Sequence, residues 1–345
     1  MGFKRLDPDD FVVSAQAITA TCWSGNATAL TTFFTQSNQV ASISGKYYTN
    51  VLNAASGSSD RASQFQIAYG NSDGGGALAY NNTAAPGVSP ASTIYGQYRS
   101  LMLEDENADF IFGTYTGSSI YVLSVERARY KESLFPGSFN LTVGKASRTI
   151  QLTDNSKDVT LPTYYGTQRA YEIVSGSDGA AWAGNGYSVN GSYGLFFPDT
   201  ATIILNAAAL DDNSSTSGVT GTNDGYGINL GTVTTTNTNG NNNQTLYNAI
   251  VSGSNFALNS EETVTSDFVF VRARNSEFNY SENPSYISGS TGEVIYNYFI
   301  NNPQTYMTTV GLYNDSNELL AVAKLSKPLN KDFTKEALIR VKLDF

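Results

Sequence analysis

The chain has 345 residues, of which 40% are hydrophobic and only 14% are charged, and its formal net charge is −10. The length predicts more than one packed lobe, and the acidic balance argues against binding to a nucleic-acid backbone, which needs clustered Lys and Arg. The sequence contains no histidine and a single cysteine, Cys22, which excludes imidazole-dependent hydrolases, most zinc sites and an internal disulfide.

The composition changes along the chain in a way that predicts four regions. Residues 1–60 are expected to form an N-terminal arm or irregular lead-in, and 61–175 a first β-rich lobe. Residues 176–250 read as a loop-rich region around one apolar core island, Tyr193–Leu210, and 251–345 as a C-terminal β-rich lobe. Neither a signal peptide nor a membrane-spanning stretch is expected, because Asp7, Asp9 and Asp10 precede any apolar run and no later run is long enough.

Periodicity predicts several elements before the C-terminal region. Apolar spacing favours a short helix over Ser92–Met102 with Ser92 as its cap, and a second helix over Leu246–Val251. Alternation over Ser119–Arg129 predicts a strand with Tyr121, Leu123 and Val125 on one face. The other expected elements are a hairpin of Phe139–Val143 with Thr149–Leu152 and a strand over Asp267–Arg274.

The C-terminal region predicts a hairpin followed by one more strand. Thr308–Tyr313 and Glu318–Leu325 alternate on either side of an Asn/Asp/Ser turn, and a final strand ends at Phe345, a core candidate. The expected fold class is therefore mainly β (α+β). The expected fold contains antiparallel sheets with a few short helices, Gly/Asn-rich loop excursions and a C-terminal three-stranded meander.

Two clusters of cations and aromatic residues are candidate interfaces, because Arg and Tyr make strong, oriented contacts between proteins. The first comprises Arg127, Arg129, Tyr130 and Lys131; its alternative is a solvent-facing strand paired with Glu126 and Glu132. In the second, Arg272 and Arg274 share a strand face with Phe268 and Phe270 and precede an aromatic loop; its alternative is a buried ion pair. The candidate interface residues are Arg127, Arg129, Tyr130, Lys131, Arg272, Arg274, Phe278, Tyr280 and Tyr313.

No catalytic, cofactor-binding or metal-binding residue is expected. The Gly-rich loop Gly70–Gly76 lacks the Lys of a phosphate-binding loop, and Asn237–Asn243 lacks the carboxylates of a calcium loop. Glycoside cleavage by paired carboxylates is the one enzymatic route left open. The candidate pairs are Asp105 with Asp109, Asp154 with Asp158, Asp211 with Asp212, and Glu261 with Glu262.

Four stretches carry a resemblance to a known group of proteins. They are VERARYKESLFPGSFNLTV (125–143), YGLFFPDTATIILN (193–206), VRARNSEFNYSENPSYISGSTGE (271–293) and VGLYNDSNELLAVAKLSKPL with KEALIRVKLDF (310–345). Together they resemble virion structural proteins of T-even-like, contractile-tailed phages that infect cyanobacteria.

This resemblance implies a non-enzymatic virion component without a cofactor, most simply a baseplate wedge subunit. The implied partners are other tail or baseplate proteins in a six-fold repeated assembly, with a homodimer within each wedge as one arrangement. It implies assembly in the host cytoplasm, and neither nucleic-acid binding nor membrane insertion. The alternatives are a host-surface carbohydrate-binding or fibre-attachment module, and a neck component.

Overall fold

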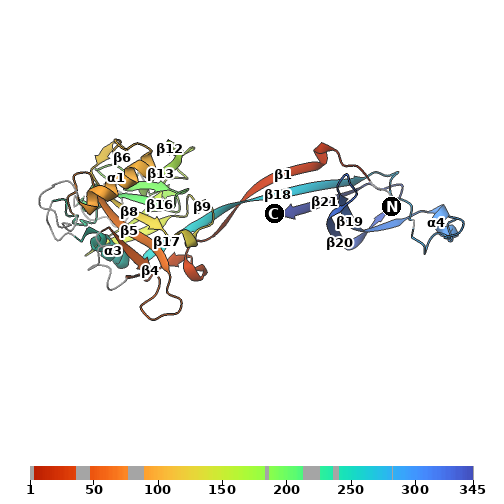
Figure 1. The fold of residues 1–345 in the computed structure, drawn as a ribbon, viewed down its shortest axis with the longest axis horizontal. Coiled ribbons are helices and arrows are strands. Elements are labelled where there is room, and N and C mark those ends of the chain that lie inside the picture. The colour runs from red at the N-terminus through yellow and green to blue at the C-terminus, as the bar shows by residue number, and fades with distance from the viewer. Residues whose placement is uncertain are drawn as a thin grey trace. The chain divides into compact units, whose positions relative to one another are not determined.

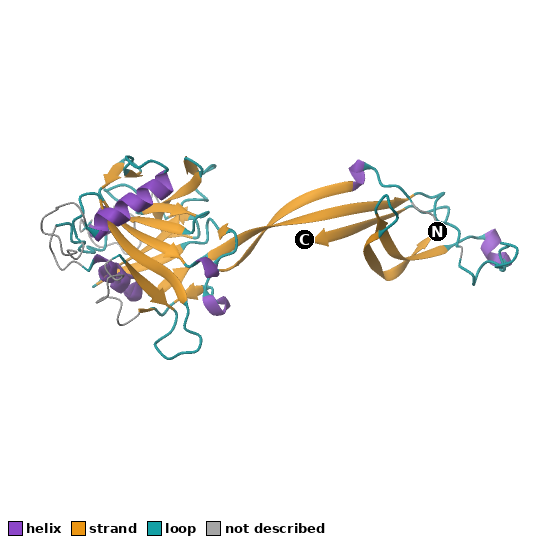
Figure 2. Ribbon diagram, in the orientation of Figure 1, coloured by secondary structure: helices purple, strands orange, loops and turns teal. Residues whose placement is uncertain are grey.

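The computed structural model describes residues 4–35, 47–76, 89–182, 186–212, 226–235, 241–281 and 283–344. The chain forms two compact units: unit 1 comprises Met1–Ala17 and Thr263–Phe345, and unit 2 comprises Ile18–Glu262. Both are built mainly of antiparallel strands (Figures 1 and 2), which confirms the mainly β class. Two strands, β1 (Phe11–Thr21) and β18 (Asn259–Ala273), contain residues of both units.

Unit 2 contains one large sheet of thirteen strands. Its main path runs in the order β2-β17-β10-β11-β13-β15-β16-β8-β5-β4-β3, with β12 and β14 paired to β13. The bounds along the chain are β2 Ala29–Leu30, β3 Phe34–Thr35, β4 Tyr48–Leu52, β5 Ser63–Asn71, β8 Ser119–Val125, β10 Asn140–Lys145 and β11 Arg148–Asp154. They continue with β12 Thr163–Tyr165, β13 Gln168–Ser177, β14 Ala180–Ala181, β15 Gly194–Phe197, β16 Thr202–Asn206 and β17 Asn255–Ala257.

The remaining elements of unit 2 are short or lie outside this sheet. β6 (Phe110–Phe112) pairs with β7 (Tyr115–Gly117), and β9 (Ser133–Leu134) pairs with the start of β18. The helices are α1 Pro90–Leu103, α2 Ala207–Asp211 and α3 Asn242–Gly253, with 3₁₀ turns η2 Ser24–Asn26 and η4 Arg127–Arg129.

The large sheet curls so that its two ends share one core. Phe65 on β5 and Phe256 on β17 are far apart in strand order, yet their ring centroids are 5.2 Å apart in an edge-on contact. The indole of Trp23 lies 4.8 Å from the Phe256 ring, and its Nε1 donates a hydrogen bond to the Phe256 carbonyl at 2.7 Å. Ring contacts of this kind add about 0.5–1.5 kcal/mol each beyond the area buried, so this aromatic cluster closes the sheet.

Strand β8 is buried on both faces because the sheet is covered on both sides. Tyr121, Leu123 and Val125 belong to the larger core cluster, as their predicted common face requires. Ile120 and Val122 point the other way, into a second cluster that includes side chains of α1. Figure 1 shows α1 lying across the strands of this face.

The predicted helices are present, but one predicted cap is wrong. Helix α1 begins at Pro90, and the hydroxyl of Ser89 accepts a hydrogen bond from the Ser92 amide. Proline at the first helical position has the fixed φ that a helix start requires and needs no amide donor, so the cap lies three residues before the predicted Ser92. Helix α1 approaches β5 at Gly70, where a Cβ would meet the Tyr95 backbone nitrogen at 2.9 Å.

The hairpin predicted from Phe139 onward is confirmed as β10 and β11, with Leu141 opposite Leu152 and Val143 opposite Ile150. The island at 193–210 forms β15, β16 and α2 and is almost entirely buried. Cys22 is buried in the same core, and desolvation raises the pKa of its thiol to about 12. The thiol is therefore protonated and inert in the folded state at neutral pH.

Unit 1 consists of a three-stranded stretch of sheet and a separate ribbon. β18 lies between β1 and β21 (Ala337–Asp344), while β19 (Thr305–Tyr313) and β20 (Leu319–Lys331) form a separate two-stranded sheet. A 3₁₀ turn η1 (Pro8–Asp10) precedes β1, and the short helix α4 spans Asn297–Asn301. The three strands predicted at the C-terminal end are present, but the last of them pairs with β18 and not with β20. Phe345 lies outside the described residues.

Candidate interaction surfaces

The sheet of unit 1 has two chemically different faces. In the register of β18 with β21, Phe268 lies opposite Lys342, Phe270 opposite Arg340 and Arg272 opposite Leu338. These residues share one face, and the guanidinium of Arg340 lies 5.3 Å from the Phe268 ring centroid. The other face is aliphatic, and its buried members are Val269, Ala273, Ala337 and Val341.

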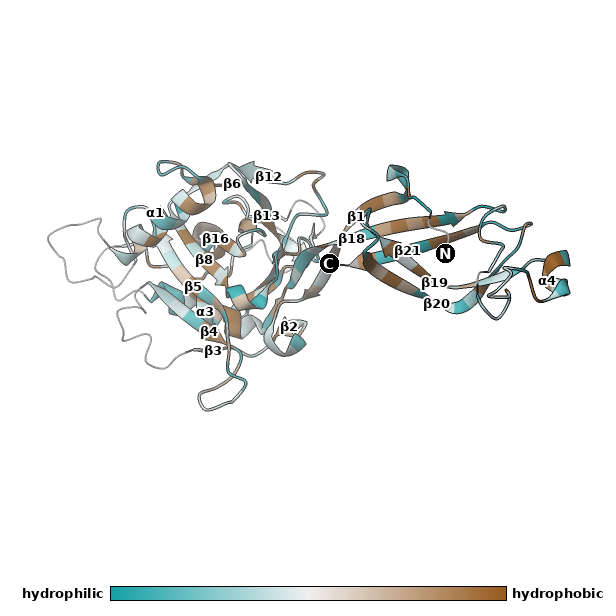
Figure 3. Cartoon of the chain, turned by 45° about the vertical axis from the view of Figure 1, so that its right-hand side comes forward, coloured by the Kyte–Doolittle hydropathy of each residue, from teal (hydrophilic) through white to brown (hydrophobic). Residues whose placement is uncertain are grey.

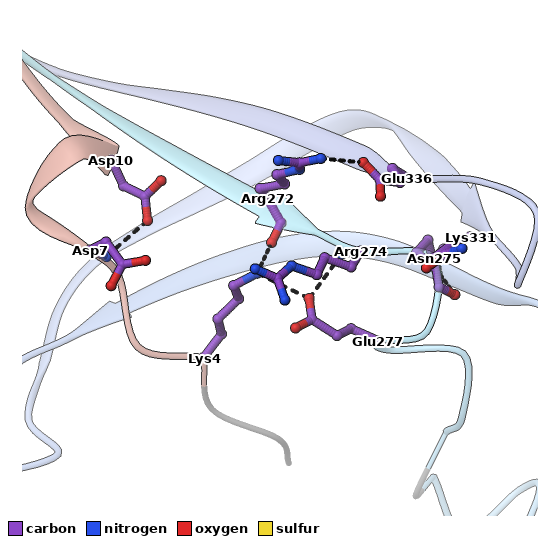
Figure 4. Close-up of polar contacts among 9 residues, drawn as sticks. All are labelled: Lys4, Asp7, Asp10, Arg272, Arg274, Asn275, Glu277, Lys331 and Glu336. Carbon is purple, nitrogen blue, oxygen red and sulfur yellow. Dashed lines mark hydrogen bonds and ion pairs between the residues drawn. The ribbon is translucent and has the colours of Figure 1, made fainter.

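Arg272 is engaged within unit 1 by an exposed ion pair. Its Nη2 donates to Glu336 Oε2 at 2.8 Å, and this contact raises the pKa of Arg272 and lowers that of Glu336 (Figure 4). Both side chains are about half exposed, so the contact is not the buried ion pair that the sequence left open. Exposed pairs of this type contribute between 0 and about 1 kcal/mol.

The N-terminal residues close the same end of the sheet. Lys4 Nζ donates to the carbonyl of Arg272 and to Glu277 Oε2, the latter at 3.0 Å (Figure 4). Glu277 also accepts a hydrogen bond from the Arg274 amide at 2.9 Å, and these donors lower its pKa. The segment before β1 is thereby attached to the turn that follows β18.

A fully buried lysine fixes the aromatic loop after β18. Lys331 Nζ donates to the Asn275 carbonyl at 3.0 Å, to Asn279 Oδ1 at 2.8 Å and to the Asp332 carbonyl at 2.9 Å. These three neutral oxygens satisfy the three donors of the ammonium group. Phe278 lies within this loop at φ 55°, a left-handed conformation that is strained for a bulky residue. The buried Lys331 therefore holds Phe278 in the position from which its ring reaches solvent.

Beside this loop lies an open groove of about 1440 Å³ whose walls carry cations, the carboxylates of Asp7 and Glu277, and apolar side chains. Its lining includes Lys4, Arg274, Phe278, Tyr280, Ile300 and Phe333. The predicted residues Arg274, Phe278 and Tyr280 are thus brought together on one surface, whereas Tyr313 lies at the far end of β19, opposite Leu319. Phe278, Tyr280 and Tyr313 are all exposed.

The other predicted cluster belongs to unit 2 and to a turn rather than a strand. Strand β8 ends at Val125, and Arg127 and Arg129 lie in η4. Arg127 Nη1 donates to the Tyr130 carbonyl at 2.8 Å, and its guanidinium lies 4.7 Å from the Tyr130 ring centroid. Lys131 is exposed. Arg127 is therefore used to close the turn, and the extended face predicted through Arg129 is absent.

Sequence reasoning missed the most exposed apolar residues of unit 1. In β1 the unit 1 residues Phe11–Ala17 are all exposed, so Phe11 and Val12 leave both faces of this strand in water. In β20, Leu320 is 68% and Val322 59% exposed. The signal was present in the sequence: apolar residues on both alternating faces normally indicate a strand that is covered on both sides.

Two carboxylates of the candidate catalytic pairs accept hydrogen bonds that hold the fold together. The Asp154 carboxylate is fully buried and accepts from the Gly137 amide at 2.8 and 3.0 Å, and burial raises its pKa. Asp211 accepts from the amide and hydroxyl of Thr232, and burial raises its pKa as well. Each of these carboxylates fixes a loop to the core of unit 2.

Asp332 gives unit 1 a pH-dependent contribution to stability. Its carboxylate accepts from the hydroxyl and amide of Thr334 and from Lys335 Nζ, and these donors lower its pKa to about 2. Because the folded pKa is below the ordinary value of 3.8, this contribution is complete above pH 4 and is lost as the pH falls toward 2. We expect Asp332→Asn to accelerate amide hydrogen exchange in β20 and β21 at pH 6, and to have a much smaller effect near pH 2, where about half of the Asp332 side chains are protonated. Asp315→Asn, in the exposed turn after β19, is the control and should change neither.

No family model matches the chain, and searches of curated proteins and of solved structures also found no match. Among the described residues, no group of three or more acidic or cysteine side chains is placed to hold a metal ion. In the same residues, no helix is long and apolar enough to cross a membrane.

Proposed function

We propose that the protein is a non-enzymatic building block of a contractile-tailed phage particle, most simply a subunit of the baseplate wedge. The single observation that supports an assembly role is that unit 1 buries far less apolar surface than unit 2. The phage assignment is supported by the resemblance of the four sequence stretches, which lie in both units.

The mismatch is clear from the distribution of buried residues. Both hydrophobic core clusters of the described chain consist entirely of unit 2 residues. Among the described residues of unit 1, the buried apolar side chains are Val269, Ala273, Phe299, Ala337 and Val341. A domain of about 100 residues must offset a conformational entropy cost on the order of 100 kcal/mol, chiefly by burying apolar surface. So small a core implies that unit 1 is completed by contacts with other subunits.

The two-stranded ribbon of β19 and β20 likewise leaves its apolar side chains uncovered. Among the residues of β19 and β20, only Lys331 is buried, and no apolar side chain of either strand is. An isolated ribbon of two strands is marginally stable at best in water. A neighbouring subunit that covers these strands would convert their apolar side chains into interface, and this is the role expected of a particle component.

Quantitative mass spectrometry of purified phage particles tests the proposal. We expect the chain to be present at a copy number divisible by six, as a wedge subunit requires. Its absence from the particle, or a single copy, would contradict the role. Saturable binding of the purified chain to host lipopolysaccharide would instead support the host-surface alternative.

A further inference from the structure

We infer that the open edge of β1 in unit 1 receives a β-strand from a different protein subunit of the particle. The edge consists of Phe11–Ala17, the part of β1 that belongs to unit 1. The inference rests on the proposed assembly role, since it names the kind of partner and the way in which that partner binds. Three observations support it: the unpaired backbone of this edge, its uncharged sequence, and its contrast with the other sheet edges.

Strand β1 lies at the edge of its sheet. In the order β1-β18-β21 it has β18 on one side, and no other described strand pairs with it (Figure 1). In an edge strand, the amide and carbonyl groups of alternate residues point away from the sheet and have no partner in it. The Phe11 amide donates to the Pro8 carbonyl, and the residues of Phe11–Ala17 are all exposed. The backbone from Val12 onward is therefore open to a further strand.

The sequence of β1 has none of the features that normally prevent an edge from pairing. Those features are charged side chains, proline, bulges and short length. β1 has 11 residues, FVVSAQAITAT, and contains no charged residue, proline or glycine. Figure 3 shows hydrophobic segments along it, and Phe11 and Val13 are 52% and 69% exposed. A long, uncharged and apolar edge of this kind is a template for another strand.

The strands that end the other described sheets are protected. β21 carries Arg340 and Lys342, and β20 carries Lys324, Lys327 and Pro328. β19 is uncharged, but two register shifts interrupt its pairing with β20 and make it irregular. The strands at the ends of the large sheet, β2 and β3, have two residues each, and β6 and β7 have three. Among these edges, β1 is the exception.

The chemistry of this edge specifies an extended partner. A row of alternating amide donors and carbonyl acceptors is satisfied as a set by another extended backbone, as in the addition of a peptide strand to a sheet. Because the side chains of Phe11–Ala17 are uncharged, the added strand should present neutral or apolar side chains beside them. Its addition would also cover part of Phe11, Val12 and Val13.

Charge disfavours a second copy of β1 as the added strand. The segment Arg5–Asp10 directly precedes β1 and has one Arg against three Asp, a net charge of −2. The next cation, Lys4, is bonded to Glu277. Parallel pairing of two β1 strands would place these acidic segments side by side, and antiparallel pairing would place each beside the far end of the other β1, which contains no cation. A strand of another subunit with Lys or Arg at its end fits better.

Amide exchange at single-residue resolution, measured on the purified full chain and on purified phage particles, tests the inference. In the free chain, alternate amides of Val12–Ala17 should exchange fast, because they point away from β18. In particles the same amides should be slowed by about tenfold or more. Edge amides that stay as fast in particles as in the free chain overturn the inference and leave the proposed function standing. Absence of the chain from particles overturns both.

The free chain also tests the alternative partner. If the edge amides are already slow in the purified chain, and light scattering gives a multiple of 37.0 kDa, a second copy occupies the edge and the inference is wrong. A single-chain mass with fast edge amides is the expected result.

Proline substitutions provide a matched pair within the strand. Successive residues of β1 point their amides in opposite directions, so one of Ala15→Pro and Gln16→Pro removes a donor to β18 and the other removes a donor at the open edge. Exchange in the free wild type shows which residue is which. The open-edge variant should keep the denaturation midpoint of the wild type but enter particles about tenfold less, when supplied in trans to phage that lack the chain.

The control is the replacement of the same residue by Thr, which keeps the amide and suits a strand; this variant should enter particles normally. Normal incorporation of a folded open-edge proline variant overturns the inference. If that variant fails to fold, the exchange comparison on the wild type decides.

Discussion

A chain that ends at Lys335 is expected to keep unit 2 folded and to lose unit 1. Strand β21 supplies Ala337 and Val341, two of the five buried apolar side chains that the structure describes in unit 1, and covers one edge of β18 along eight residue pairs. Removal of this strand exposes Val269 and leaves the unit 1 part of β18 with one neighbour, β1, because β9 pairs with β18 at Ser260 and Glu261 in unit 2. Neither core cluster of unit 2 contains a residue from this strand, so the damage should stop at the unit boundary.

Limited proteolysis followed by mass spectrometry measures this effect. We expect cleavage throughout 263–335 in the truncated chain at protease levels that leave the full chain intact, and an unchanged protected fragment from unit 2. The truncated chain should also be missing from phage particles assembled in its presence. Equal protection of unit 1 in both chains, or normal incorporation, would show that β21 is dispensable.

The substitution Phe256→Ala should destabilise unit 2 by about 3–5 kcal/mol, the usual cost of deleting a fully buried aromatic ring. The ring contacts Trp23, Phe65 and Phe139 with centroid distances of 4.8, 5.2 and 5.9 Å. These residues join opposite ends of the curled sheet, so the resulting cavity lies where the sheet closes. The loss is a substantial part of the stability of a typical domain.

Chemical denaturation monitored by labelling of Cys22 with a thiol reagent reports this change, because this single thiol is buried in the same core. The midpoint for Phe256→Ala should fall steeply, with labelling at denaturant concentrations that leave the wild type unmodified. Phe333→Ala is the matched control: its ring is 57% exposed in unit 1, so its effect on the Cys22 midpoint should be within about 0.5 kcal/mol. If Phe256→Ala also changes the stability by no more than about 0.5 kcal/mol, Phe256 does not close the sheet.

Local pattern was enough to predict most individual elements. The alternation of Tyr121, Leu123 and Val125 gave the correct common face of β8, because side chains in a strand alternate with a period of two. The end of this strand was predicted four residues too late. The alternation of residue types continues through Arg129, but the strand ends at Val125 and Arg127–Arg129 form a 3₁₀ turn. A polar segment next to a strand is compatible with both structures.

Pairing between distant strands could not be predicted in the same way. The final strand follows the β19–β20 hairpin in sequence and was expected beside it, but it pairs with β18. Alternation shows that a segment is a strand and which residues share a face; it does not specify the neighbour. For the candidate surface, the aromatic loop at Phe278 and Tyr280 was predicted from composition, whereas Lys331, which holds this loop, resembles any other lysine in the sequence.

The pairing of β1 with β18 sets an order of events during synthesis. Phe11–Val13 leaves the ribosome before unit 2, whereas most of β18, the strand to which β1 is hydrogen-bonded, is made only after it. At about 5–20 residues per second, β1 waits roughly 10–50 s for its partner strand. During this interval unit 2 can already fold, while an apolar strand remains open to chaperones or to neighbouring nascent chains on the same messenger.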